Sequence, residues 1–390
     1  MSTPPTANNP QQSPILIMAK RAALMRAQGR DVIDLTLGEP DFNAPPHVLV
    51  AAHAALSGRL TYSPSNGIEP LRHAIRMRMR MKDIRNLDYA DDQVTVGCGA
   101  KQIIYNAFQA TLKSGDEVIV PAPYWASYPA MIKMCGARPL IVSTTKEEGF
   151  RLTAEHLDAA FRLAKSPKWV VLNAPGNPSG SLYSRKQLLA IAEVLRRYPG
   201  VMVLSDDIYS EIRYTNDPYQ TLAAVAPDLR DRILIVDGVS KVYAMTGWRV
   251  GWGCGPTPLI TAISSVQSQN CTQTSTLSQL AAVAALTGSQ ALVKERNAIY
   301  RQRRDSALNV LGACEAIDVE CPEGAFYLLP RIRTIKDDQA FALILLEAGV
   351  ATVPGSAFGM PGHLRLSFAT DESILIAGCE RLVQKIKASI

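Results

Sequence analysis

Residues 233–253 read ILIVDGVSKVYAMTGWRVGWG, and we interpret the rest of the chain outward from this stretch. It begins with four apolar residues, 233–236, which is typical of a buried strand. It then presents one lysine, Lys241, before a Gly-Trp-Arg turn at residues 247–249. A lysine held between a buried strand and a glycine turn can be desolvated, which leaves its amine free to react with carbonyl groups. The alternative is a solvated lysine in a loop, so the choice depends on the other strands.

The same order of features, an apolar strand followed by a polar motif, occurs at four other places. Helical patterns follow two of these motifs, at residues 102–112 and 184–197. Strands that alternate with helices predict an α/β fold with a mainly parallel sheet flanked by helices. Because ligands of such sheets bind beyond the carboxyl ends of the strands, the motifs should converge on one site. The expected strands and motifs are 93–96 with GCGAK, 117–120 with PAPYW, 169–172 with NAPGNPSG, 201–204 with SDDIY, and 233–236 with the lysine stretch.

The GCGAK motif, residues 97–101, suits the binding of a phosphate group. Glycines before a helix leave backbone N–H groups free at the positive end of the helix dipole. The motif lacks the GxxxxGK[ST] spacing of nucleotide-binding loops and the GxGxxG spacing of dinucleotide-binding folds, which disfavours both classes of enzyme. Such a glycine pair can also be only a tight turn, so the motif by itself leaves both interpretations open.

Polar residues after the other strands match the remaining parts of one cofactor. Trp125 can lie flat against an aromatic ring, and Asp206 can pair with a protonated ring nitrogen. Asn177 and Tyr209 can donate hydrogen bonds to a phenolate oxygen, and Arg249 can bind a phosphate through two N–H groups. Taken singly, the tryptophan could equally pack in the core and the aspartate could equally cap a helix. Together with the lysine, these groups describe a site for pyridoxal 5′-phosphate.

Composition disfavours several other classes of protein. The 390 residues are 47% hydrophobic and 19% charged, which is ordinary for a globular protein and long enough for two domains. The chain has no run of about 18 apolar residues that would predict a membrane span, and the polar residues 1–14 do not resemble a secretory signal. The seven cysteines include no CxxC pair, and the five histidines form no metal-ligand pair at helical spacing. We therefore expect a cytoplasmic protein that uses neither disulfides nor a metal.

Much of the net charge of +6 lies in one segment, residues 72–85 (RHAIRMRMRMKDIR). An apolar stripe at Leu71, Ile75 and Met79 predicts a helix there, with arginines along another face. A nucleic-acid-binding arm would carry interleaved aromatic residues, which this segment lacks. We interpret the run as a solvated helix face and expect no nucleic acid as a partner.

Several motifs together carry a resemblance to a known family. The sequence resembles the fold-type I, class I aminotransferases, in the branch that includes bacterial aspartate and prephenate aminotransferases, from about residue 14 to its end. The motifs are LGEPDF at 37–42, PYWASYP at 123–129, NAPGNPSG at 173–180, SDDIY at 205–209, SKVYAMTGWRVG at 240–251 and RLSFA at 365–369.

The resemblance also implies how the chain is divided and assembled. It implies a large domain over residues 47–289 that binds the cofactor, and a smaller α+β domain built from residues 1–46 and 290–390. It implies a homodimer with shared active sites, in which Tyr62 reaches the phosphate of the neighbouring subunit.

The resemblance assigns roles around the cofactor residue by residue. Lys241 is implied to form the Schiff base and then to act as the catalytic base. Asp206 is implied to pair with the pyridine nitrogen, and Tyr209 to hold the phenolate oxygen. The other residues implied to contact the cofactor are Gly99, Ala100, Lys101, Trp125, Asn177, Ser240 and Arg249.

The same resemblance implies a substrate site. Arg365 would bind the α-carboxylate of the substrate with help from the Gly38 backbone, beside Trp125 and Asn177. Lys101 is open between two roles, a contact to the distal carboxylate of aspartate, glutamate or prephenate, and a contact to phosphate or solvent only. The peptide bond before Pro178 is implied to be cis.

The implied activity is transamination between an L-amino acid, of the aspartate or glutamate type, and a 2-oxo acid. Apolar residues 15–17, expected before the first helix where similar enzymes close a gate, leave aromatic or aliphatic amino acids open as substrates. A carbon–sulfur lyase that uses the same cofactor, lysine and aspartate is the other alternative. A DNA-binding regulator is disfavoured because the roughly 35 residues before LGEPDF are too few for a winged helix.

Overall fold

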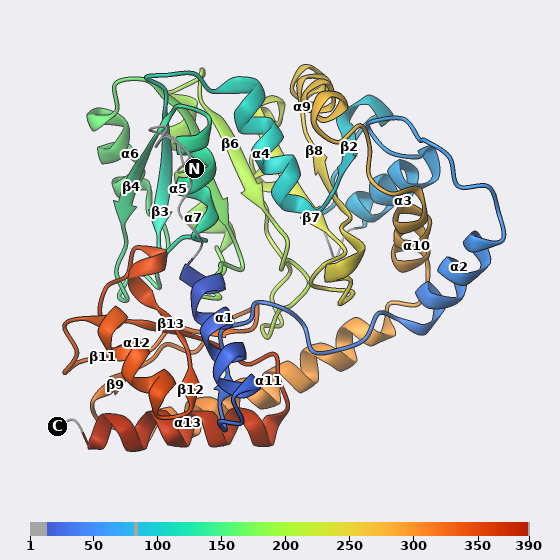
Figure 1. Ribbon diagram of the computed structural model, residues 1–390. Coiled ribbons are helices and arrows are strands. Elements are labelled where there is room, and N and C mark those ends of the chain that lie inside the picture. Colours follow the sequence, from blue (N-terminus) through green and yellow to red (C-terminus); the bar gives the residue numbers. More distant parts are fainter. Residues whose placement is uncertain (1–13, 82–84, 389–390) are drawn as a thin grey trace, which may run out of the picture.

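The computed structural model describes residues 14–81 and 85–388. A seven-stranded sheet in the order β2-β8-β7-β6-β5-β3-β4 occupies its upper part (Figure 1). Strand β8 is antiparallel to β2 and β7, and the other neighbours are parallel, so the prediction of a mainly parallel sheet is confirmed. The strands are β2 (Val94–Gly97), β3 (Glu117–Ala122), β4 (Arg138–Ser143), β5 (Pro167–Asn173), β6 (Met202–Asp206), β7 (Ile233–Gly238) and β8 (Gly251–Cys254).

The continuous apolar run of β7 is explained by two cores, one on each face of the sheet. Ile233 and Ile235 belong to one apolar cluster, whereas Leu234 and Val236 belong to the other. Side chains of a strand alternate between its faces, so a strand that is covered on both sides has no polar face to expose. Every residue of β7 is accordingly buried.

Helices cover both faces of this sheet. Residues of α4, α5 and α9 pack in the cluster with Leu234, and residues of α6 and α7 pack in the cluster with Ile233. Local signals set the starts of two of them, since Thr153 caps α6 and Ser184 with Gln187 forms a capping box on α7. The helices are α4 (Ala100–Thr111), α5 (Ser127–Met134), α6 (Ala154–Leu163), α7 (Arg185–Arg196), α8 (Leu222–Val225) and α9 (Thr257–Asn270).

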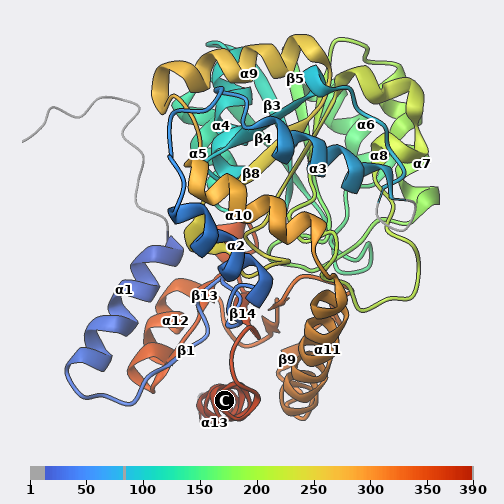
Figure 2. The ribbon, with the colours of Figure 1, turned by 90° about the vertical axis from the view of Figure 1, so that its right-hand side faces the viewer.

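The predicted basic helix is α3 (Glu69–Arg80), which packs with α2 (Pro46–Leu56) against α10 (Thr276–Thr287) (Figure 2). Our expectation of a solvated basic face is wrong for part of this run. Arg72 and Arg78 are buried, and they form ion pairs with Asp91 and Glu211. Only near the end of the helix, at Arg80, is an arginine pair solvated on both sides. These two arginines therefore tie α3 to the segments that carry Asp91 and Glu211.

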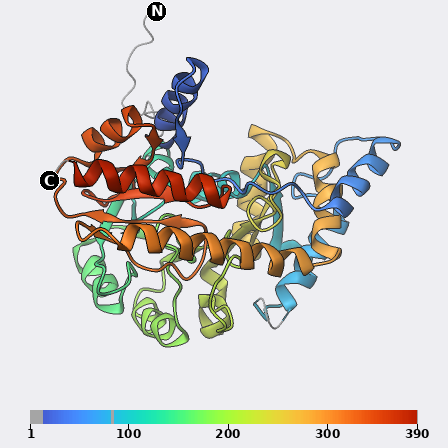
Figure 3. The same ribbon diagram turned by 90° about the horizontal axis from the view of Figure 1, so that it is seen from below.

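The first and last described segments of the chain, which include α1 and α13, lie together below the large sheet (Figures 1 and 3). Strand β1 pairs in parallel with β12, although they lie at opposite ends of the sequence, and α11 packs along α13. Three strands, β10, β14 and β13, form a small antiparallel sheet, and β9 pairs with β11. The elements are α1 (Pro14–Ala27), β1 (Ile33–Asp34), α11 (Ala291–Gly312), β9 (Ile317–Asp318), β10 (Tyr327–Leu328), β11 (Arg331–Ile332), α12 (Asp338–Glu347), β12 (Val350–Ala351), β13 (Val353–Pro354), β14 (Leu364–Ser367) and α13 (Glu372–Lys387).

Short 3-10 turns complete the described part of the chain. The 3-10 turns are η1 (Asp91–Gln93), η2 (Pro227–Arg232), η3 (Thr246–Trp248) and η4 (Gly355–Phe358).

Within the described ranges no single helix is long and apolar enough to cross a membrane. Helices α10 and α11 pass such a test of length and composition only as a pair, across a bend of 84°.

Candidate active site

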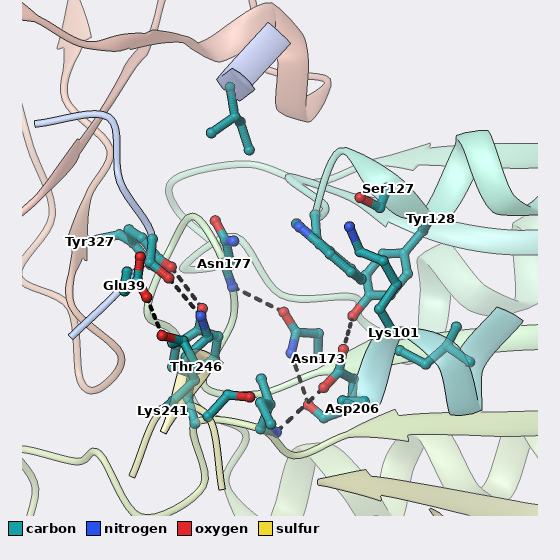
Figure 4. A pocket seen from close by; sticks show the side chains of 18 of the residues that line it. Glu39, Lys101, Ser127, Tyr128, Asn173, Asn177, Asp206, Lys241, Thr246 and Tyr327 are labelled. Carbon is teal, nitrogen blue, oxygen red and sulfur yellow. Dashed lines mark hydrogen bonds between the residues drawn. The ribbon is translucent and has the colours of Figure 1, made fainter. Parts of the chain in front are cut away.

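The polar motifs converge on a cavity of about 360 Å³ at the carboxyl edge of the large sheet (Figure 4). The part of the chain below the sheet closes the other side of this cavity with residues from α1, β10 and β14. The residues predicted for the site that line this cavity are Gly38, Ala100, Lys101, Trp125, Asn177, Asp206, Tyr209, Ser240, Lys241, Arg249 and Arg365.

Lys241 lies in the turn after β7 and is partly buried. Its Nζ donates a hydrogen bond to the Gly38 carbonyl oxygen at 2.6 Å. Burial lowers the pKa of Lys241 to about 8, against the opposing effect of the Glu39 carboxylate. A larger fraction of the side chain is therefore the neutral amine than for a solvated lysine, which is the form that attacks a carbonyl carbon.

Asp206 is the last residue of β6 and is buried in the floor of the cavity. Its Oδ2 accepts a hydrogen bond from the Tyr128 hydroxyl at 2.5 Å. Burial raises the pKa of Asp206 to about 6, although the Tyr128 hydroxyl and the Ile208 N–H favour the anion. A turn rather than a helix follows Asp206, so the alternative of a helix cap is not supported.

The GCGAK turn places three positive groups on one side of the cavity. Gly99 has φ +85°, and a Cβ there would lie 2.5 Å from Nη2 of Arg249, so only glycine lets the turn approach this arginine. Helix α4 begins at Ala100, which directs free N–H groups into the same space. The pKa of Lys101 is lowered, first by desolvation and second by the positive charge of the nearby Arg249. The arrangement suits a group that carries negative charge.

Arg365, on β14, is a buried cation with an incomplete set of partners. Its Nη1 donates to Asn177 Oδ1 at 3.2 Å, and its Nη2 donates to the Thr36 carbonyl oxygen. The Nε has no hydrogen-bond partner, and the salt bridges of the described residues include none to this guanidinium. A buried guanidinium without a carboxylate is suited to bind one from a ligand.

Residues 30–382 of the chain match the protein family described as "Aminotransferase class I and II". The chain belongs to this family. It is 44% identical to the aspartate aminotransferase of Rhizobium meliloti strain 1021, over 95% of this chain and 92% of that protein. It is 42% identical to the aspartate/prephenate aminotransferase of Cereibacter sphaeroides, over 95% of each chain.

Solved structures agree with the fold. The crystal structure of the aspartate aminotransferase from Rhizobium meliloti matches with a TM-score of 0.94 and 42% identity, over 99% of each chain. The Thermus thermophilus aspartate aminotransferase with maleate matches with a TM-score of 0.92 and 37% identity, over 98% of this chain and all of that one. The predicted fold class and the resemblance to aminotransferases are confirmed.

Two residues predicted for the site of this aminotransferase do not line the cavity. Gly99 lies just behind it, where it contacts Arg249. Tyr62 is 88% exposed, in the segment between α2 and α3, and is not among the lining residues. Within one subunit it has no place in the site, so its role stays a prediction that depends on a second subunit.

The structure also decides how Trp125 and Lys101 lie. Lys101 Nζ stands 4.8 Å from the centre of the Trp125 ring, as a cation over an aromatic face. Tyr128 packs edge-on against the same indole, with ring centres 5.3 Å apart. Both Lys101 and Trp125 line the cavity, so each is within reach of a ligand, and the two roles open for Lys101 stay open.

Some of the residues that line the cavity were given no role in the sequence analysis. Tyr128 was part of a family motif but had no predicted role, although it contacts Asp206 directly. Glu39, also without a predicted role, accepts a hydrogen bond from the Thr246 hydroxyl. Tyr327 was not missed, because the resemblance to aminotransferases implies that it completes the pocket; it exchanges a hydrogen bond with Tyr209 at 2.7 Å. A tyrosine three residues after Trp125, in the first turn of a helix, was a signal that could have been used for Tyr128.

Two further expectations can be compared with the structure. Helix α1 begins at Pro14, so residues 15–17 lie inside the helix and not before it, which corrects the prediction. Ile15 and Leu16 line the cavity from that helix. The Asn177–Pro178 peptide bond is cis, as the resemblance implies.

A buried ion cluster supports the floor of the site from behind. Arg85 contacts the Asp207 carboxylate at 3.0 Å and the Asp237 carboxylate at 2.6 Å, and it donates to the Ser210 hydroxyl at 3.0 Å. Asp207 follows Asp206 directly, and Asp237 lies near the end of β7. Burial raises the pKa of Asp237 to about 7, against the effect of Arg85. One arginine therefore joins the ends of the two strands that carry the aspartate and the lysine of the site.

Proposed function

We propose that this aminotransferase uses pyridoxal 5′-phosphate to transfer an amino group between an aspartate- or glutamate-type L-amino acid and a 2-oxo acid. The observation that carries the proposal is the set of groups around one cavity. Lys241 has a lowered pKa, Asp206 is a buried carboxyl, and Arg365 is a buried guanidinium without a carboxylate partner among the described residues. Relatives named aspartate aminotransferase support the substrate class.

The residues present fit the cofactor group by group. The glycine turn with Arg249 and Ser240 would hold the phosphate, since a side chain at Gly99 would meet the guanidinium. Asp206 would hold the pyridine nitrogen, and Tyr209 with Asn177 would hold the phenolate oxygen. Trp125 would lie against the ring, and Lys241 would bond to the aldehyde carbon. No polar group of the cofactor is left without a partner of suitable chemistry in this assignment.

When bound, the cofactor supplies an electron sink for the Cα of the amino acid. Asp206, as a buried anion, favours a protonated ring nitrogen and so strengthens that sink. Lys241 would act as the base that removes the proton from Cα and delivers it to the carbon of the cofactor that carried the aldehyde. Arg365 binds the α-carboxylate, which fixes Cα next to the amine of Lys241.

Lys101 is the residue we propose for the distal carboxylate. It lines the cavity over the Trp125 ring, and among the described residues the lining includes no other lysine besides Lys241. The Thermus thermophilus relative was solved with maleate, a dicarboxylate. Ile15, Leu16 and Leu37 also line the cavity, so a substrate with an apolar side chain could contact them instead. Aromatic or aliphatic amino acids are therefore the alternative substrates.

We further propose a cytoplasmic homodimer whose subunits share their active sites. Tyr62 is 88% exposed, and the neighbouring helix α2 leaves apolar side chains uncovered at Leu49, Val50 and Leu56. Exposed apolar residues in one region are typical of a surface that another subunit covers. The domains would be residues 47–289 and residues 1–46 with 290–390, with the cavity between them.

The test of the function is a panel of amino donors with the purified protein. Aspartate and glutamate should react with 2-oxoglutarate or oxaloacetate, and a larger kcat/KM for alanine or phenylalanine would contradict the dicarboxylate assignment. Borohydride reduction should attach the pyridoxyl group to the peptide that contains Lys241. Attachment to another lysine would contradict the assignment of the catalytic residue.

A further inference from the structure

Two cysteine thiols that the proposed mechanism does not use lie in contact beside the phosphate-binding turn. Cys98 stands between β2 and Gly99, and Cys271 directly follows α9. Their Sγ atoms are 3.9 Å apart, and both residues are partly buried free thiols. The sulfurs share a further neighbour, the carbonyl oxygen of Gln273, at 3.8 Å from each.

The side chain of Gln102 holds the two cysteines next to each other. Its Oε1 accepts a hydrogen bond from the backbone N–H of Cys98 at 2.6 Å, and its Nε2 donates to Sγ of Cys271 at 2.8 Å. Gln102 belongs to the first turn of α4, the helix whose start faces the cavity. The contact between the thiols is therefore anchored to the phosphate-binding turn.

Cys98 is also joined directly to the groups proposed to bind phosphate. Its carbonyl oxygen accepts a hydrogen bond from Nη2 of Arg249 at 3.2 Å, and the next residue is Gly99. The turn and the guanidinium are closely packed, because a Cβ at Gly99 would lie 2.5 Å from Nη2. A displacement of Cys98 would change the position of Arg249 relative to the N–H groups at the start of α4.

We propose that Cys98 and Cys271 are a redox-sensitive thiol pair, and that a disulfide formed between them by hydrogen peroxide weakens binding of the cofactor phosphate. In the first step one sulfur loses its proton and, as the thiolate, attacks a peroxide oxygen; the O–O bond breaks, the sulfur becomes a sulfenic acid, and the expelled hydroxide takes up the thiol's proton to form water. In the second step the other sulfur attacks that sulfenic sulfur, the S–S bond forms, and a second water leaves. The two thiols lose two electrons and two protons, and one peroxide is reduced to two waters.

The sulfurs are already in van der Waals contact, and the bond requires them to move closer. The sulfurs must approach from 3.9 Å to about 2.05 Å. Burial raises the pKa of the Cys98 thiol, which lowers the fraction of thiolate and makes the first step slower than for an ordinary exposed cysteine. Formation of the disulfide is independent of the proposed function, whereas its effect on phosphate binding rests on it.

The experiment treats the purified, cofactor-loaded protein with hydrogen peroxide, blocks remaining thiols by alkylation, and maps the peptides without reduction. The expected result is a linked pair of peptides that contain Cys98 and Cys271, and release of the linkage by dithiothreitol. The dissociation constant for pyridoxal 5′-phosphate, measured by absorbance after dialysis, should become about tenfold weaker, the loss that one hydrogen bond to a charged group accounts for.

Matched variants separate this effect from general oxidation. Cys271→Ser should keep its cofactor after peroxide, and Cys98→Ser should form no linkage. Cys321→Ser removes an exposed cysteine elsewhere and should respond as the unchanged protein does. Peroxide that oxidises Cys321 without linking Cys98 to Cys271 would overturn the proposal. A linkage without loss of cofactor affinity would overturn its second part, and failure of the reduced protein to bind the cofactor would instead contradict the proposed function.

Discussion

At the scale of single residues, the site depends on how burial changes ordinary side chains. Lys241 is one of many lysines, but its surroundings lower its pKa to about 8. Asp206 is shifted in the opposite direction, to about 6, by the same physical cause. Burial disfavours the charged form of each group, so the lysine becomes a better nucleophile and the aspartate needs help to stay ionised.

The first prediction concerns the pH dependence of cofactor binding. Below the pKa of about 8 Lys241 is mainly the ammonium, and above it the amine that can attack the aldehyde is the main form. The rate at which the cofactor-free protein takes up pyridoxal 5′-phosphate should therefore rise about tenfold from pH 7 to pH 9 and then level off. Stopped-flow absorbance measures this rate. A rate that keeps rising beyond pH 10 would show a lysine with an ordinary pKa.

The second prediction concerns Tyr128→Phe. The change removes a hydrogen bond that favours the anion of Asp206, so the pKa of this carboxyl should rise further above its ordinary value. Loss of a hydrogen bond to a charged group, worth about 1.5–3 kcal/mol, corresponds to roughly one to two pH units. The acid limb of the kcat/KM profile should move upward by that amount, with activity retained at high pH. An equal loss at every pH would indicate a purely structural role.

The third prediction concerns Lys101→Ala. If the ammonium binds the distal carboxylate, kcat/KM for aspartate and glutamate should fall about 10- to 150-fold, the value of a charged hydrogen bond. Alanine, which has no distal carboxylate, should be little affected. Steady-state kinetics on both kinds of substrate decide the matter, since an equal loss on alanine would place Lys101 at the phosphate instead.

At the scale of secondary-structure elements, the catalytic groups stand at strand ends that need support from behind. The lysine follows β7, and the aspartate is the last residue of the adjacent parallel strand β6. Arg85 binds carboxylates at both of these strand ends. The arginine thus links the turn that follows β6 to the end of β7, through side chains rather than through the backbone hydrogen bonds of the sheet.

The fourth prediction follows for Arg85→Ala. This change leaves Asp207 and Asp237 buried without their cation, which should lower the free energy of unfolding by about 3–5 kcal/mol. Arg80→Ala is the matched control, because its pair with Asp88 is solvated and is worth at most about 1 kcal/mol. Urea unfolding measures both values. Similar losses for the two variants would refute the importance of the buried cluster.

At the scale of the whole molecule, the cavity is closed by parts that are distant in the sequence. Arg365 comes from β14 and Gly38 from the segment after β1, and both face residues of the large sheet. The exposed Tyr62 is a predicted cofactor contact that the fold of a single described chain leaves outside the cavity, whereas Gly99 lies directly behind it. In the proposed dimer, the Tyr62 side chain of the second subunit would complete the cavity near the phosphate.

The fifth prediction uses two inactive variants to test the shared site. Lys241→Ala lacks the base, and Tyr62→Ala lacks the proposed contact to the neighbour's phosphate. If the sites are shared, a mixed dimer has one site with both changes and one unchanged site, so random mixing should restore about a quarter of the sites. Activity at limiting cofactor after refolding the mixture measures this recovery. The absence of any recovery would show that Tyr62 does not act across subunits.

The sequence by itself determined the α/β fold, the order of most elements and the polar motifs at the strand ends, although Tyr128 and Glu39 were missed among the residues around the cavity. These follow from local patterns, since an apolar run predicts a buried strand and a polar motif after it predicts a ligand-binding end. The boundaries differ by a few residues, as for the helix expected at 184–197 and found at Arg185–Arg196.

Only the tertiary structure decided which distant residues meet. Tyr128 is 78 positions from Asp206, and Arg85 is 152 positions from Asp237, so no periodicity relates these pairs. The arginines of the basic run looked solvated in the sequence, yet Arg72 and Arg78 are buried against carboxylates. Side-chain pKa values, ion pairs and the contact of two thiols arise from packing at close range, and packing joins segments that the sequence order keeps apart.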